Sequence, residues 1–171
     1  MRSDRRGGKM TRAPLLVLAV GNPSRGDDAL GPALLERLRE AGVEAAGEVE
    51  LLTDFQLQVE HALDLEQRCA VLFVDAARPG AAIGVTVEPI HADARIPPAS
   101  HALRPQAVLH VAAQLAGCAP PAWQLAIEGE GFSLGEGLSP TAERHLDRAV
   151  AMTMDWLREH GAAAVARRCH A

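Results

Sequence analysis

Aromatic residues are scarce in this chain of 171 residues: they make up 3% of it, and tyrosine is absent. The core must therefore be built mainly from Ala, Leu and Val. No stretch approaches the ~18 consecutive apolar residues of a membrane-spanning helix, which argues against a membrane partner. The formal net charge of −5 lacks the basic excess that marks nucleic-acid-binding proteins. The composition is that of a globular protein, and the length suits a single domain.

Cysteine is rare as well, and its three positions are widely spaced. They are Cys69, Cys118 and Cys169. They form neither a CxxC motif nor the dense, even set that a disulfide framework needs. We therefore expect reduced thiols, and with them a cytoplasmic location.

The amino end is basic and is followed by the apolar run 15–20, a combination that a signal peptide would also show. The run is short for that purpose, and it leads into Gly-Asn-Pro at 21–23 rather than into a small-residue cleavage site. We expect residues 1–13 to be a disordered basic tail in front of a buried strand.

Several catalytic motifs are missing. The loop 21–26 follows the first apolar run but lacks the Gly-Lys-Ser/Thr ending of a phosphate-binding loop. No GxGxxG follows that run, so a dinucleotide site is not expected. HExxH is also absent, which argues against a zinc protease of that type.

Hydrophobic periodicity predicts five strands and four helices. The strands are expected at 15–20, 48–53, 69–74, 83–90 and 123–127, and the fourth should be an edge or antiparallel strand. The helices are expected to begin near residues 30, 54, 105 and 140, the second ending near 68 and the last near 160. This order predicts an α/β fold, a three-layer α/β/α sandwich with a twisted, mostly parallel five-stranded sheet. The single domain should span 14–160, and 161–171 should be a flexible tail.

Residues at the expected helix ends fit their positions. Gly42 and Gly117 suit the left-handed position that follows a helix. Thr53 and Gln56 have the spacing of a capping box, which would open the second helix. Ser139 would cap the last helix, with proline in its first turn.

Acidic side chains follow three of the predicted strands. The pair Asp27-Asp28 follows the first, Asp54 the second and Asp75 the third, while His101 lies in the loop before the third helix. Ligands of such sheets bind beyond the carboxyl ends of the strands, so we expect these side chains to converge on one edge. Each also has an ordinary alternative: a helix cap for Asp27 or Asp28, a turn for Asp75, and a surface position for His101.

Two carboxylates and one imidazole together suit a borderline divalent cation such as nickel, zinc or manganese. Three protein ligands would leave coordination positions open, as in a functional rather than a structural site. Two further histidines, His61 and His110, fall on predicted helices. We expect both to be solvated and assign them no role.

The motifs together resemble those of a known family. Val17 to Gly31, with Gly21-Asn22-Pro23 and then Gly26-Asp27-Asp28, is similar to the opening of the nickel–iron hydrogenase maturation proteases. The resemblance continues through Val74-Asp75-Ala76, Ser100-His101-Ala102-Leu103 and Gly137-Leu138-Ser139-Pro140, and it covers most of residues 15–160. These endopeptidases remove a C-terminal extension from the hydrogenase large-subunit precursor after nickel insertion. The resemblance implies the same activity and partner for the domain 14–160.

The resemblance also implies roles for particular residues. Asp28, Asp75 and His101 would contact the nickel held by the precursor, so no permanent cofactor is expected. Because the family is grouped with the aspartic-type endopeptidases, Asp54 or Asp75 would be the catalytic base that activates a water molecule. We expect a monomer, which leaves the site open to a large partner.

The sequence departs from the family pattern in two places. Many members have Glu where Asp28 stands and Gly where Ala29 stands. Many also have Asp-Gly-Gly-Thr where this chain has Asp54 followed by Phe-Gln-Leu, which indicates a different precursor surface. Two other functions stay open: a non-catalytic assembly chaperone for the precursor, and a protease of the same fold with a different protein substrate.

Overall fold

Five strands form one sheet in the order β2-β1-β3-β5-β4. The computed structural model describes residues 12–95 and 103–168. Its strands are β1 (Leu15–Val20), β2 (Val49–Asp54), β3 (Ala70–Ala77), β4 (Val85–Ile90) and β5 (Ala122–Glu128). All neighbours pair in parallel except β4, which pairs antiparallel with β5 at the sheet edge. The predicted mostly parallel sheet and its antiparallel edge strand are both confirmed.

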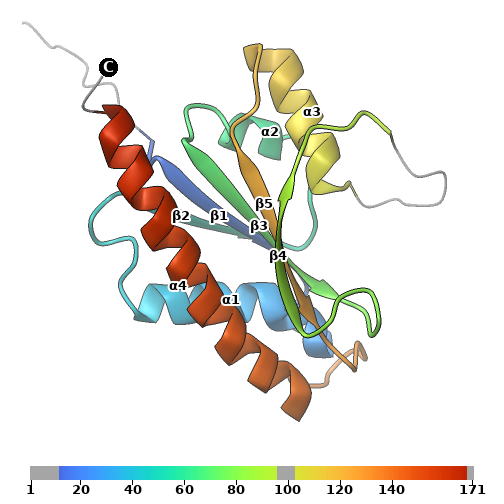
Figure 1. Ribbon diagram of the computed structural model, residues 1–171. Coiled ribbons are helices and arrows are strands. Elements are labelled where there is room, and N and C mark those ends of the chain that lie inside the picture. The colour runs from blue at the N-terminus through green and yellow to red at the C-terminus, as the bar shows by residue number, and fades with distance from the viewer. Residues whose placement is uncertain (1–11, 96–102, 169–171) are drawn as a thin grey trace, which may run out of the picture.

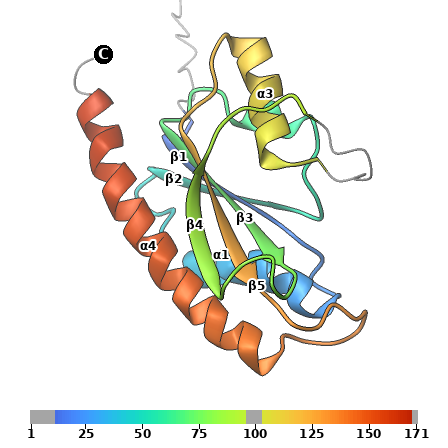
Figure 2. The same cartoon turned by 45° about the vertical axis from the view of Figure 1, so that its right-hand side comes forward.

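Helices cover both faces of this sheet, which gives the three expected layers (Figures 1 and 2). They are η1 (Gly26–Ala29, a 3-10 helix), α1 (Leu30–Glu40), α2 (His61–Asp64), α3 (Pro105–Ala116) and α4 (Pro140–Arg168). α1 and α4 pack on one face, and α2 and α3 pack on the other. Because β1 lies between two other strands and two helical layers, every one of its residues is buried, as a continuous apolar run predicts.

The second helix departs most from the sequence prediction. It is limited to His61–Asp64, so a helix opened by Thr53 and Gln56 is wrong. β2 instead continues to Asp54 in parallel register with β1, and sheet pairing overrides the local capping signal. β3 likewise continues to Ala77 through its pairing with β5. Asp75 therefore lies within a strand rather than in a turn after it.

The last helix begins as predicted and ends later. The hydroxyl oxygen of Ser139 accepts a hydrogen bond from the Ala142 N–H at 3.1 Å, which caps the first turn. The helix then continues past the expected end near His160 as far as Arg168. Trp156 and His160 stack on each other, and both rings contact Trp123 of β5. These contacts hold the helix against the sheet at the point where the prediction ended it.

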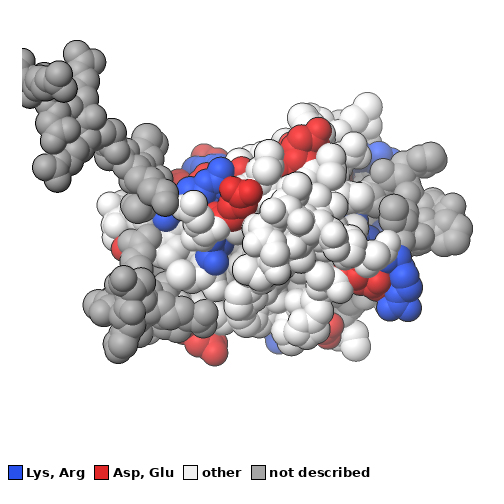
Figure 3. Space-filling model, turned by 90° about the horizontal axis from the view of Figure 1, so that it is seen from above, with Lys and Arg blue, Asp and Glu red and all other residues white. Residues whose placement is uncertain are grey.

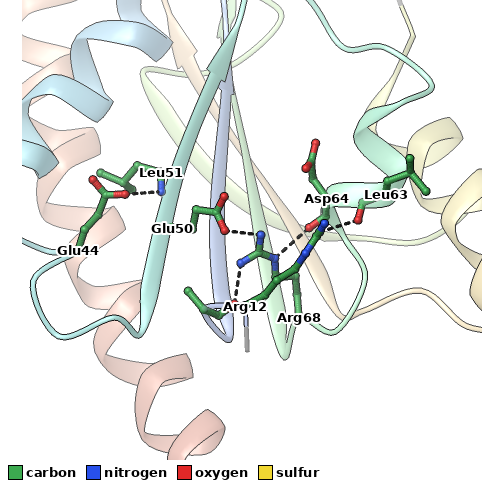
Figure 4. A network of polar contacts seen from close by, with 8 residues as sticks. Arg12, Glu44, Glu50, Leu51, Leu63, Asp64 and Arg68 are labelled. Carbon is green, nitrogen blue, oxygen red and sulfur yellow. Dashed lines mark hydrogen bonds and ion pairs between the residues drawn. The ribbon is translucent and has the colours of Figure 1, made fainter. Parts of the chain in front are cut away.

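A buried arginine joins the beginnings of the first two strands to the end of α2 (Figure 4). The side chain of Arg68 is 1% exposed and forms an ion pair with Glu50 of β2 at 2.5 Å. It also donates to the carbonyl oxygens of Asp64 and Ala13. Arg12 donates to the carbonyl oxygen of Leu63 nearby. Residues 12 and 13, assigned to the basic tail from the sequence, are therefore held against the domain; residues 1–11 lie outside the described part of the chain.

Figure 3 shows the molecule from above the view of Figure 1, and charged side chains are dispersed over the surface seen there. Acidic and basic residues form small mixed groups there, separated by wide uncharged areas. Within the described residues, no helix has the length and apolar character needed to cross a membrane.

Replacing Arg68 with Ala should lower the free energy of unfolding by about 3 kcal/mol. The change removes one partner of a part-buried ion pair and leaves two carbonyl oxygens without their donor. Urea denaturation at pH 7 measures the effect. The matched control is Arg148→Ala on the exposed side of α4, for which we expect a change below about 0.5 kcal/mol. Equal effects of the two substitutions would contradict the anchoring role of Arg68.

Candidate active site

The sheet register places two of the predicted acids on the same face. Val20 of β1 pairs with Asp54 of β2. On the other side of β1, Ala19 pairs with Val74, so Asp75 is the next position along β3. Asp54 and Asp75 therefore stand in one row, separated only by β1, on the face that α2 and α3 pack against. With strands ~4.8 Å apart, their backbones are about 10 Å apart.

Asp28 reaches this row from the turn that follows β1. Gly21 has a φ of +146°, and a Cβ on it would lie 2.0 Å from the carbonyl oxygen of Asp28. Only glycine allows the two backbone segments to approach so closely. The Asn22 N–H then donates to a carboxylate oxygen of Asp28 at 2.9 Å. Because this bond fixes the side chain, Asp28 is held above the carboxyl end of the sheet.

Asp28 and Asp75 line the same cavity, which has a volume of about 340 Å³. The remaining wall is formed by Val20, Gly21, Phe55, Gln56, Leu57, Leu103, Arg104, Pro105, Gln106 and Gln124. The expected meeting of the acids at one sheet edge is thus present for these two. Asp54 is not part of the wall, which at that end is formed by the residues that follow it.

The electrostatics of Asp75 differ from those of an ordinary carboxylate. Burial, and then the negative charge of Asp28, raise the pKa of Asp75 from 3.8 to about 7. A hydrogen bond from the Ala76 backbone opposes this effect only in part. At neutral pH the Asp75 carboxyl is therefore present in both its protonated and its ionised form, which suits general acid–base chemistry.

Asp27 faces the other way and is fully buried. One of its carboxylate oxygens accepts the N–H groups of Glu130 and Gly131 and the hydroxyl of Ser139. The other oxygen accepts the Ser139 N–H at 2.7 Å. Burial alone would raise the pKa of Asp27, but these hydrogen bonds outweigh it and the pKa is lowered. The sequence left open which of the two neighbouring aspartates has only a structural role, and the contacts assign that role to Asp27.

His61 is buried and paired with Asp54, so the prediction of a solvated histidine is wrong. Its Nδ1 accepts the Gln58 N–H at 2.9 Å, which leaves the proton of a neutral ring on Nε2. That nitrogen lies 3.4 Å from a carboxylate oxygen of Asp54. The other Asp54 oxygen accepts the Phe55 N–H at 2.6 Å. The Asp54 carboxylate is therefore held in one orientation, next in the chain to residues 55–57, which line the cavity.

The histidine prediction failed because it depended on the wrong helix. A helix from residue 54 would have turned His61 toward solvent, whereas the turn at 55–60 directs it inward. The sequence shows only that His61 follows Asp54 by seven positions, and hydrophobic periodicity does not indicate that two such residues pair.

The third expected metal ligand, His101, lies outside the described residues. The described chain resumes at Leu103, and Leu103 and Arg104 both line the cavity. Among the described residues, no group of three or more His, Cys, Asp and Glu side chains is arranged to hold a metal ion. Asp28 and Asp75 supply two oxygen donors of the kind that a divalent cation accepts.

Comparison with known proteins gives matches among solved structures. No protein-family model matches the chain, and no curated protein sequence matches it. The hydrogenase maturating endopeptidase HybD from E. coli aligns with a TM-score of 0.69 and 24% identity, over 86% of this chain and 93% of that one. The NiFe hydrogenase maturation protease HycI from Thermococcus kodakarensis KOD1 aligns with a TM-score of 0.65 and 20% identity, over 85% and 93% of the two chains.

A third match is an endopeptidase from Escherichia coli whose structure was determined in solution. It aligns with a TM-score of 0.65 and 25% identity, over 86% of this chain and 93% of that one. The chain thus has the fold of the hydrogenase maturation proteases, as the resemblance of its motifs implied.

Replacing Asp75 with Asn should stabilise the protein at pH 8 and leave its stability unchanged near pH 3. Above about pH 7 the folded protein carries a buried charge at Asp75 that the unfolded chain exposes to water. Below the unfolded pKa of 3.8 the carboxyl is neutral in both states. The shift corresponds to a gain on the order of 4 kcal/mol at pH 8.

Thermal or urea unfolding across pH 3–8 measures this gain, with Asp155→Asn on the exposed side of α4 as the control. If the stability difference between Asp75→Asn and the unchanged protein did not grow as the pH rises from 4 to 7, the pKa of Asp75 would not be raised in the folded protein.

Replacing Asp27 with Asn should destabilise the protein by about 2–3 kcal/mol at pH 7. An amide has one acceptor oxygen and would turn its NH₂ group toward donors that the carboxylate accepts. Because the pKa of Asp27 is lowered in the folded state, its contribution is present above pH 3.8 and is lost as the pH falls through the folded-state value. Urea unfolding at pH 7 and pH 3 tests this, with the neighbouring Asp28→Asn as the matched control. If Asp28→Asn were as destabilising as Asp27→Asn, the structural role would not be specific to Asp27.

Proposed function

We propose that this protein is an endopeptidase that removes the C-terminal extension of a nickel–iron hydrogenase large-subunit precursor after nickel insertion. The carrying observation is the cavity in which Asp28 and Asp75 face each other at the carboxyl edge of the sheet. This cavity occurs in a fold whose solved relatives are named hydrogenase maturation endopeptidases and proteases. The motifs that resemble that family contribute both of these acids.

In this proposal the nickel is part of the substrate. The carboxylates of Asp28 and Asp75 contact it from the cavity, and His101 is the third contact. A divalent cation beside the two carboxylates would favour the ionised form of Asp75 and release its proton. Docking of a nickel-loaded precursor therefore relieves a repulsion that the free protein carries. A precursor without nickel offers no such gain, which accounts for cleavage only after nickel insertion.

Hydrolysis requires a group that takes a proton from water as the water attacks the scissile carbonyl. Asp54 and Asp75 are the catalytic candidates. Asp75 has a pKa suited to proton transfer near neutrality, but it also contacts nickel. Asp54 is not committed to the metal, and His61 and the Phe55 N–H fix its orientation. We assign to Asp54 the positioning of substrate or of the attacking water, with the precursor's nickel polarising the carbonyl or the water.

The remaining features of the proposal follow from these assignments. The activity belongs to the aspartic-type endopeptidases because the catalytic candidates are carboxylates. No permanent cofactor is needed when the nickel arrives with the substrate. We propose a cytoplasmic monomer, since the few, widely spaced cysteines suit reduced thiols and the cavity must admit a large partner.

Mass spectrometry of a large-subunit precursor from the same source tests this function. The precursor is incubated with the protein, with and without nickel loading. We expect a mass loss at the C-terminus in the nickel-loaded sample only. Cleavage in both samples would retain a protease and reject nickel recognition, as for a same-fold protease with another substrate. A stable complex without cleavage would instead indicate an assembly chaperone.

His101→Ala should abolish this cleavage while leaving the thermal unfolding midpoint within a few degrees of the unchanged protein. The matched control is His91→Ala, at an exposed histidine after β4, which should cleave at the normal rate. Normal cleavage by His101→Ala would remove His101 from the nickel contacts.

A further inference from the structure

A second hollow adjoins the acid-lined cavity on the same side of the sheet. It has a volume of about 440 Å³ and lies over the strands β5 and β4. Its wall includes Thr86, Glu88 and Ala126, together with residues 81–83 of the loop before β4. Gln106 and Gln124 line this hollow and also line the acid-lined cavity. The two spaces therefore meet at these two amide side chains.

The strand register explains why the hollow opens beside Asp75. Asp75 of β3 pairs with Ala126 of β5, and Ala126 pairs with Thr86 of β4. All three side chains point to the α3 side of the sheet, because alternate residues of a strand share a face. Ala126 and Thr86 have small side chains, so the sheet surface beyond Asp75 is left open as far as the edge strand.

The groups at the junction suit the main chain of a polypeptide. An amide side chain offers both a donor and an acceptor, as does each peptide unit that it could meet. The side-chain oxygen of Gln106 is buried and has no hydrogen-bond partner within the described part of the chain. Arg104 lines the acid-lined cavity. Its Nε is also buried and has no hydrogen-bond partner among the described residues. Buried polar groups normally have partners, so these two atoms indicate an absent one.

The length of the path sets the size of the occupant. From Val20 across β3 and β5 to Thr86 on β4 there are three strand intervals of ~4.8 Å, or about 14 Å. An extended chain advances ~3.3 Å per residue, so about four residues fit along it. A compact ligand would fill one hollow only.

We propose that the two hollows form one groove, which binds an extended polypeptide across the carboxyl ends of β1, β3 and β5 and the amino end of the antiparallel strand β4. Gln106 and Gln124 form hydrogen bonds with the main chain of this segment. The hollow at Thr86 and Ala126 receives the side chains that lie on one side of the scissile peptide bond, which itself lies above Asp75. That this segment is the C-terminal region of the hydrogenase precursor rests on the proposed function. The groove itself rests on the register, the two shared amides and the unpartnered atoms of Gln106 and Arg104.

Steady-state cleavage of the precursor by Ala126→Leu tests the groove. The larger side chain narrows the second hollow and replaces neither Asp28 nor Asp75. We expect KM to rise at least about tenfold with kcat within about twofold, because the substitution removes binding and not chemistry. Ala151→Leu, the same change at an exposed position of α4, should change neither constant. An unchanged KM for a folded Ala126→Leu would overturn the proposal.

Gln106→Leu gives an independent check at the junction. It should also raise KM and leave kcat near normal, whereas Gln114→Leu, at an exposed position of the same helix, should not. Loss of kcat with an unchanged KM in Gln106→Leu would mean that the amide serves the chemistry and not the binding of the main chain, which contradicts the proposal.

Binding without cleavage separates the groove from the proposed function. A synthetic peptide of the last 20 residues of the precursor is titrated into the unchanged protein, and backbone amide shifts are followed by NMR. We expect the largest changes at Gln124, Ala126 and Thr86. Shifts there without any cleavage of the precursor would support the groove and reject the endopeptidase. No shifts at these amides at peptide concentrations that saturate cleavage would reject the groove and retain the endopeptidase.

Discussion

The buried Asp27 carboxylate is the contact on which the site depends. It accepts hydrogen bonds from two loop amides and from both the N–H and the hydroxyl of Ser139. Through these bonds the turn after β1 is joined to the start of α4, although the two are more than a hundred positions apart in the chain. A Cβ on Gly129 would lie 2.5 Å from the Cβ of Asp27, so the loop approaches as closely as glycine allows. Asp28 is the next residue, and this attachment therefore determines where its side chain enters the cavity.

The cavity holds two acids whose proximity is unfavourable for the folded protein alone. Burial and the charge of Asp28 raise the pKa of Asp75 to about 7, which means that ionising Asp75 costs stability at neutral pH. Strain of this kind is common at functional sites, where a ligand relieves it. A divalent cation held by the substrate would relieve it, whereas a second anion would increase it. The electrostatics thus favour a substrate that brings positive charge into the cavity.

Local sequence patterns predicted the parts of the fold that local forces determine. Apolar runs identified the buried strands, and Ser139 correctly marked the start of α4. The glycines at 42 and 117 have the positive φ expected where α1 and α3 end. The failures arose where distant contacts decide: β2 and β3 lengthen because their neighbours extend the pairing, and α2 shortens as a consequence. For the site, the sequence indicated that Asp28 and Asp75 would meet. It missed the Asp54–His61 pair, which depends on a turn that no periodic pattern describes. The placement of His101 stays a prediction.

The central claim is that burial and the charge of Asp28 raise the pKa of Asp75 to about 7, and NMR of aspartate carboxyl carbons tests it most directly. In protein labelled at these carbons, the account predicts one aspartate with a titration midpoint near pH 7. That midpoint should fall when Asp28 is replaced by Asn, because the neighbouring charge is then absent. Titration of every aspartate below about pH 5, or a high midpoint that Asp28→Asn leaves unchanged, would contradict the account.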